Sequence, residues 1–145
     1  MGKINWSRVL LGGLLAGLAI NVVESISGMV YMDEMKASLE AHGLTMNESV
    51  GMIVFWVVYG FVWGIAAIWL YASVRPRFGA GPKTAVITGV GFWFIGYLLP
   101  MVGWSSIGLY PASMLTTWTL LGLVEMVIAT LLGAWIYKEE ESAAA

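Results

Sequence analysis

The feature that most constrains this chain is an apolar run from Pro111 to Tyr137 with a single carboxylate, Glu125, near its centre. As an α-helix rising about 1.5 Å per residue, this run is roughly 40 Å long and can cross a bilayer with some tilt. A carboxylate at the midplane of a membrane is costly in free energy. We therefore expect Glu125 to face protein or a water-filled cavity rather than lipid.

Three further apolar segments precede this run and make the chain a predicted membrane protein. Hydrophobic residues are 59% and charged residues 11% of the 145, whereas about a quarter of the residues in soluble domains are charged. The sequence predicts one domain, an all-α antiparallel bundle of four transmembrane helices. The predicted spans are about 8–31, 46–74, 83–104 and 111–137. The predicted outer loop, cytoplasmic loop and C-terminal tail are 32–45, 75–82 and 138–145.

The first span imitates a cleavable signal peptide, because Lys3 and Arg8 precede an apolar run that leads to small residues around Ser27. The apolar run continues through Tyr31, which is too long for the apolar region of a signal peptide. We expect a retained first span.

Glycine, proline and capping residues predict where the helices end. Gly43 is expected to end an amphipathic extension of the first helix, and Thr45–Glu48 has the spacing of a capping box that starts the second. The stretch Arg75–Lys83, with two prolines and two glycines, is expected to end the second helix, and Pro100 to kink or end the third. Pro111 is a favourable first residue for the fourth.

The distribution of charge predicts the orientation of the chain. Six of its seven basic residues fall on one side of a four-span topology. These six are Lys3, Arg8, Arg75, Arg77, Lys83 and Lys138. The seventh, Lys36, lies in the acidic outer loop. Because basic residues favour the cytoplasmic side, both termini are predicted to be cytoplasmic in an inner (plasma) membrane protein. Arg75, Arg77 and Lys83 set this topology and can contact anionic lipid headgroups.

The stretch Trp69–Ala85, WLYASVRPRFGAGPKTA, resembles a group of small bacterial four-span integral membrane proteins. The likeness extends more loosely to NWSRVLLGGLLAGLAINVVES near the start of the chain. The resemblance implies a bacterial integral membrane protein and carries no activity with it.

Small residues at helical spacing predict close contacts between the spans, because they let helix backbones approach each other in lipid. The first and second spans each carry a Gly-x-x-x-Gly pattern, and two further glycines share a face with Glu125. The predicted packing positions are Gly13, Gly17, Gly60, Gly64, Gly122 and Gly133.

Asn21, Glu24 and Glu125 form the predicted polar centre of the membrane domain. Asn21 and Glu125 both lie roughly 18–20 Å from the cytoplasmic ends of their helices, and Glu24 lies one turn further out. We therefore expect the first and fourth spans to pack together, with a hydrogen bond between Asn21 and Glu125. Burial favours the neutral form of a carboxylic acid, which predicts a protonated Glu125.

The sequence indicates no enzyme, metal site or cofactor site. It has no cysteine, its one histidine, His42, falls in the outer loop, and it has no phosphate-binding loop. A net charge of −2 gives no reason to expect nucleic acid as a partner. The leading expectation is a non-enzymatic structural or accessory subunit that forms a homo-oligomer or joins a larger membrane complex. One alternative is a proton, cation or solute transporter or channel that uses Glu125, Glu24 and Asn21. Another is a site for an apolar ligand such as lipid or quinone, lined by aromatic residues of the second and third spans.

Overall fold

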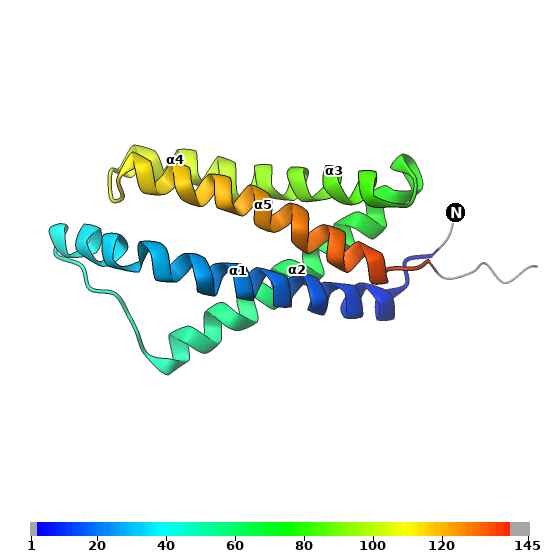
Figure 1. Cartoon of the computed structure of the whole chain (residues 1–145), viewed down its shortest axis with the longest axis horizontal. Helices are drawn as coiled ribbons and strands as arrows, with labels where there is room; N and C mark the ends of the chain where they lie inside the picture. Colours follow the sequence, from blue (N-terminus) through cyan, green and yellow to red (C-terminus); the bar gives the residue numbers. More distant parts are fainter. Residues whose placement is uncertain (1–2, 140–145) are drawn as a thin grey trace, which may run out of the picture.

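The computed structural model describes residues 3–139, and all of its regular structure in that range is helical. The elements are α1 (Trp6–Ala41), α2 (Val50–Phe78), α3 (Pro82–Trp93), the π-helical turn η1 (Phe94–Leu98), α4 (Leu99–Ile107) and α5 (Ala112–Ile136). Because α3, η1 and α4 run on without a break, residues 3–139 contain four helices long and apolar enough to cross a membrane (Figure 1). The prediction of an all-α protein with four such helices is confirmed. Residues 140–145 of the predicted tail lie outside the described residues.

The first loop differs from its prediction at one end. α1 ends at Ala41, followed by Gly43 with φ of +71°, as expected for a glycine that reverses the chain. α2 starts at Val50, and its N-cap is Ser49, whose Oγ accepts a hydrogen bond from the Met52 N–H. The predicted capping box at Thr45–Glu48 is wrong. Glu48 instead forms an ion pair with Lys36 across the loop.

Pro76 lies inside the last turn of α2 without ending it, and the helix ends within the stretch Arg75–Lys83, as predicted. The helix continues to Phe78. There Gly79 takes φ of +86° and donates its N–H to the Arg75 carbonyl at 2.8 Å. Pro76 has no backbone N–H to donate. Because it lies so close to the helix end, only the final turn is affected, and the Gly79–Arg75 hydrogen bond closes that turn.

Pro100 likewise fails to end its helix, because the chain widens into the π-turn η1 just before it. The Leu99 N–H bonds to the Phe94 carbonyl, five residues back, and α4 then continues to Ile107. A π-turn is a recognised way for a helix to absorb a local break in its hydrogen-bond ladder.

Glycines set the closest helix contacts. A Cβ added to Gly64 of α2 would lie 2.3 Å from the Gly17 nitrogen and 2.4 Å from the Gly13 oxygen of α1. On the other side of α1, a Cβ on Gly12 would lie 2.5 Å from the Gly133 oxygen of α5. Backbone therefore meets backbone on two sides of α1, the kind of packing that holds helices together in lipid.

The buried side chains gather in the half of the bundle that holds the described chain ends and the turn between α2 and α3. Its largest members include Val9, Ile68, Tyr71, Met126 and Tyr137. In the opposite half, α2 diverges from α1 (Figure 1). All residues from Ile53 to Tyr59 are exposed there, so apart from the Asn21 contact at Val57 that part of α2 has little cover from a neighbouring helix.

We predict that Gly64→Ala destabilises the fold by about 1–3 kcal/mol, because the new methyl group would displace the α1 backbone. Unfolding of the purified protein in mild detergent, followed by circular dichroism, measures this loss. Gly91→Ala is the matched control, since a Cβ there meets no atom within 4 Å. Its helix propensity should make it neutral or slightly stabilising. Equal losses in the two variants would contradict the packing argument.

Candidate functional site

Two carboxyl groups from different helices meet at one tyrosine hydroxyl inside the bundle. Tyr97 Oη of η1 lies 2.8 Å from Glu125 Oε1 of α5 and 3.2 Å from Glu24 Oε1 of α1. Tyr31 of α1 donates from its Oη to Glu24 Oε2 at 3.0 Å. We call Glu24, Tyr31, Tyr97 and Glu125 the carboxyl cluster. Glu125 is 2% exposed, whereas Glu24 is exposed.

The geometry of the carboxyl cluster fits a pair of acids that holds one proton. A tyrosine hydroxyl has one hydrogen to donate. Both contacts of Tyr97 are therefore hydrogen bonds only when one carboxyl group is protonated and donates to Tyr97 Oη. The two ion pairs found within residues 3–139 join Lys36 to Glu48 and Arg75 to Glu139, so neither neutralises the cluster. A retained proton avoids placing two uncompensated charges side by side in an apolar region.

The fold makes room for Tyr97 with a glycine and a π-turn. A Cβ on Gly122 would lie 2.5 Å from Cδ1 of the Tyr97 ring, so only glycine leaves space for this ring beside Glu125. Tyr97 lies within η1, and its ring packs edge-on against Trp63 of α2, with 5.5 Å between the ring centroids. Because π-turns occur often at functional sites, this one marks the cluster as more than ordinary packing.

Aromatic rings surround the carboxyl cluster. The Tyr31 ring packs edge-on against Trp118 of α5 at 5.0 Å between centroids. Trp118 Nε1 is buried and has no hydrogen-bond partner in the described part of the chain. Together with Trp63, these rings place π-faces and a free N–H donor around two acids. Such rings attract cations, and the N–H suits an oxygen of water or solute.

Asn21 does not join the cluster, so the predicted hydrogen bond from Asn21 to Glu125 is wrong. The Asn21 amide nitrogen donates to the Gly17 carbonyl at 2.8 Å and to the Val57 carbonyl of α2 at 3.2 Å. It therefore ties α1 to α2, at the point where these two helices begin to diverge. Glu125 is satisfied by Tyr97 instead.

The predicted packing glycines fall at two kinds of contact. Gly13 and Gly17 meet Gly60 and Gly64 along the α1–α2 interface. The glycines near Glu125 face different elements, since Gly122 lies under Tyr97 and Gly133 against Gly12 and Ile68.

The basic residues of the second loop divide into one held side chain and two exposed ones. The guanidinium carbon of Arg75 lies 5.5 Å from the ring centroid of Tyr137, and Arg75 Nη1 is 3.8 Å from Glu139 Oε1. Arg75 therefore ties the end of α2 to the segment that follows α5. Arg77 and Lys83 are exposed and can reach lipid headgroups.

Two groups outside the spans have shifted pKa values. The hydrogen bond and charge of Glu48 raise the pKa of Lys36. Lys36 is consequently charged at neutral pH, and it loses this charge as the pH rises through its raised pKa. Burial raises the pKa of Tyr110, which lies in the turn before α5 and keeps its proton at neutral pH.

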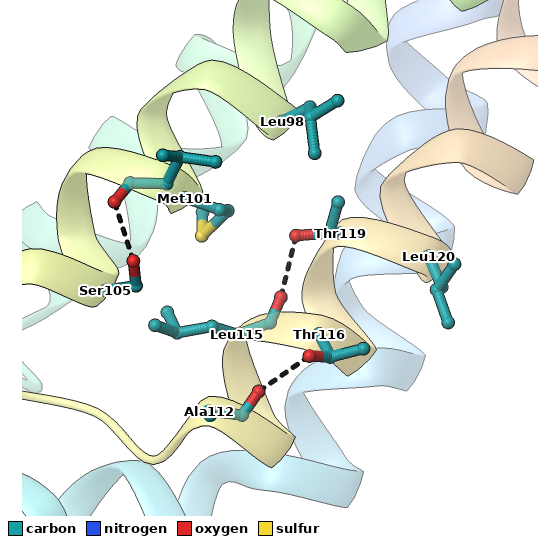
Figure 2. Close-up of a pocket in the computed structure, with 9 residues that line it drawn as sticks. Leu98, Met101, Ser105, Ala112, Leu115, Thr116, Thr119 and Leu120 are labelled. Atoms are coloured by element: carbon teal, nitrogen blue, oxygen red, sulfur yellow. Dashed lines mark hydrogen bonds between the residues drawn. The ribbon is translucent and has the colours of Figure 1, made fainter.

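An open apolar cavity of about 290 Å³ lies between α4 and α5 (Figure 2). Its lining differs from the predicted aromatic one and includes Leu98, Met101, Val102, Ser105, Ala112, Leu115, Thr116, Thr119 and Leu120. The hydroxyl groups of Ser105, Thr116 and Thr119 each donate to a carbonyl of their own helix (Figure 2). No hydroxyl proton of these three remains to orient a ligand, so the cavity suits a hydrocarbon chain rather than a specific solute.

Comparison with protein-family models, curated proteins and solved structures finds no match for this chain. The fold therefore defines the class, which is a multi-pass helical membrane protein.

Tyr97 and Tyr31 are the site residues that sequence reasoning missed. Both carry a polar hydroxyl within or at the end of an apolar span, and Tyr97 lies three residues before Pro100. The signal available in the sequence for Tyr97 was therefore its position close to a proline inside a predicted span. The rotation that η1 gives to Tyr97 does not follow from the sequence pattern.

We predict that Tyr97→Phe costs about 1–3 kcal/mol of stability, because it leaves a buried Glu125 oxygen without its donor. The phenylalanine ring keeps the contacts with Trp63 and Gly122. Thermal unfolding in mild detergent measures the loss. Tyr110→Phe is the matched control, because the Tyr110 hydroxyl forms no hydrogen bond within residues 3–139 and the phenylalanine ring keeps the contact with Trp118. This change should cost less than half as much. Equal costs would refute the bridging role.

Proposed function

We propose that the chain is a bacterial inner-membrane protein with four antiparallel spans and both termini in the cytoplasm. The α1–α2 contacts support the antiparallel arrangement, since Gly13, Gly17 and Asn21 meet successively earlier residues of α2. The six basic residues on one side support the orientation.

This topology predicts which loop can be reached from outside the cell. The chain has no cysteine, so single cysteines can be labelled cleanly. A membrane-impermeant maleimide should label Ala41→Cys in intact cells and Ala80→Cys only after the membrane is permeabilised. Both native alanines are exposed, which makes them a matched pair. The reverse pattern would invert the orientation.

Within this topology, we infer a non-enzymatic transport function in which the carboxyl cluster exchanges a proton for a cation. The observation that carries this proposal is the single hydroxyl shared by Glu24 and Glu125. It links the protonation of one acid to that of the other, and the surrounding rings provide a surface for a cation. Intramembrane acids that face the bundle interior commonly mark proton or ion pathways.

Glu125→Gln should abolish proton flux in liposomes while the protein stays folded, because an amide cannot release a proton at this site. The measurement is the response of an enclosed pH dye to an imposed ion gradient. Glu40→Gln is the control, since Glu40 is exposed at the far end of α1 and outside the predicted spans. Flux that survives in Glu125→Gln at the level of Glu40→Gln would reject transport through the cluster.

A structural or accessory subunit is the second candidate function, and the burial of Glu125 favours it. A 2% exposed carboxyl group bonded to Tyr97 can serve purely as an interhelical hydrogen bond that fixes helix register. In that case the Glu125→Gln variant should still bind every partner subunit that the native protein binds. Co-purification from native membranes in mild detergent, read by native mass spectrometry, separates the two candidates.

A further inference from the structure

The first ten residues of α2, Val50–Tyr59, have few packing partners, and we call them the unpacked segment. Val50 is 76% exposed, and Trp56 58%. The aromatic rings of Phe55, Trp56 and Tyr59 pack on one another, with centroids 5.3–5.9 Å apart. Beyond the Asn21–Val57 hydrogen bond α2 diverges from α1 (Figure 1). Because Ile53–Tyr59 are all exposed, we call the uncovered surface between the segment and α1 the wedge.

An exposed carboxyl group on the α1 side of this wedge makes lipid a poor filling for it. Glu24 is exposed and lies one turn beyond Asn21, within the predicted first span. The hydroxyl of the neighbouring Ser25 is already bonded to the Asn21 carbonyl, which leaves the carboxyl group of Glu24 as the polar group that lipid cannot satisfy. Hydrocarbon tails offer no hydrogen bonds, so an exposed carboxyl group at this depth calls for a protein or aqueous neighbour. The carboxyl cluster is thus closed on the Glu125 side and open on the Glu24 side.

The unpacked segment carries a hydrogen-bond donor at the level of Glu24. The contacts between α1 and α2 pair Gly13 with Ile65, Gly17 with Phe61 and Asn21 with Val57. Each step of four residues forward along α1 therefore corresponds to a step of four residues back along α2. Continuing this register places Glu24 level with Val54. Trp56 is two residues away, about 3 Å along the helix axis. The Trp56 N–H is therefore a donor near the depth at which Glu24 presents an acceptor.

We propose that a second copy of this chain fills the wedge, the unpacked segment of each copy packing against the Glu24 side of the other. A two-fold axis along the membrane normal keeps each residue at its own depth, so the donor of one copy meets the acceptor of its partner. The surface is thus complementary to itself, as a two-fold interface requires. The dimer completes the carboxyl cluster, which a single copy leaves open.

The available area agrees with a dimer. Three half-exposed aromatic and five exposed aliphatic side chains on the unpacked segment offer on the order of 500 Å². Together with the facing surface of α1, this area approaches the roughly 800 Å² per partner that is typical of stable interfaces. The assignment of this surface rests on packing and depth alone and does not depend on the transport function.

Single cysteines in liposomes test the dimer, because the native chain has none. Val54→Cys lies on the unpacked segment and Val124→Cys on α5, and the two native valines are 55% and 57% exposed. With a short thiol-reactive crosslinker at high lipid dilution, Val54→Cys should give several times more dimer than Val124→Cys. Equal yields, or no dimer from either variant, would overturn the proposal.

Two further measurements keep the result unambiguous. Trp56→Ala in the Val54→Cys background should reduce the dimer yield severalfold while the melting temperature of the monomer is kept. An unchanged yield would show that the segment is not the interface. In native membranes, crosslinking of Val54→Cys to a foreign protein instead of a second copy would also overturn the proposal.

Discussion

Lipid cannot satisfy a carboxyl group, and the packing around Glu125 follows from this constraint. Its neighbours must supply a hydrogen-bond donor, exclude hydrocarbon and still leave no gap. Tyr97 supplies the donor, and Gly122 provides the space for its ring. The π-turn lies where that ring must be directed inward. One buried acid thus explains a tyrosine and a glycine that would otherwise look unrelated, beside the π-turn that precedes Pro100.

Glycine contacts provide the rigid frame that this site needs. α1 lies between α2 and α5 at backbone contact distance, through Gly64 on one side and Gly133 on the other. Such contacts allow little sliding, because any shift would bring backbone atoms into collision. The frame is firm where the glycines lie and ends at Asn21. Beyond that residue the two helices separate, and Glu24 is exposed.

The sequence alone located some of these features and missed others. It identified Glu125 and Glu24 as intramembrane acids, because charge in an apolar run is visible without a structure. It misassigned the partner of Glu125, since helical depth can be counted along a chain but the direction in which a side chain points around the helix cannot. Asn21 has a depth close to that of Glu125 and yet bonds to α2. The Arg75–Lys83 stretch ends α2 as predicted, whereas the helix is distorted into a π-turn before Pro100 without ending there, because the Leu99 N–H reaches the Phe94 carbonyl.

The sequence by itself determined that this is a four-helix membrane chain with acids inside its spans. That information is local, because length, apolarity and charge are properties of each segment alone. Only the tertiary structure decided that Glu24 and Glu125 share a tyrosine and that the start of α2 is left unpacked. These features depend on how helices rotate about their axes and cross, which is set by side-chain volumes fitted between helices and not by any one segment.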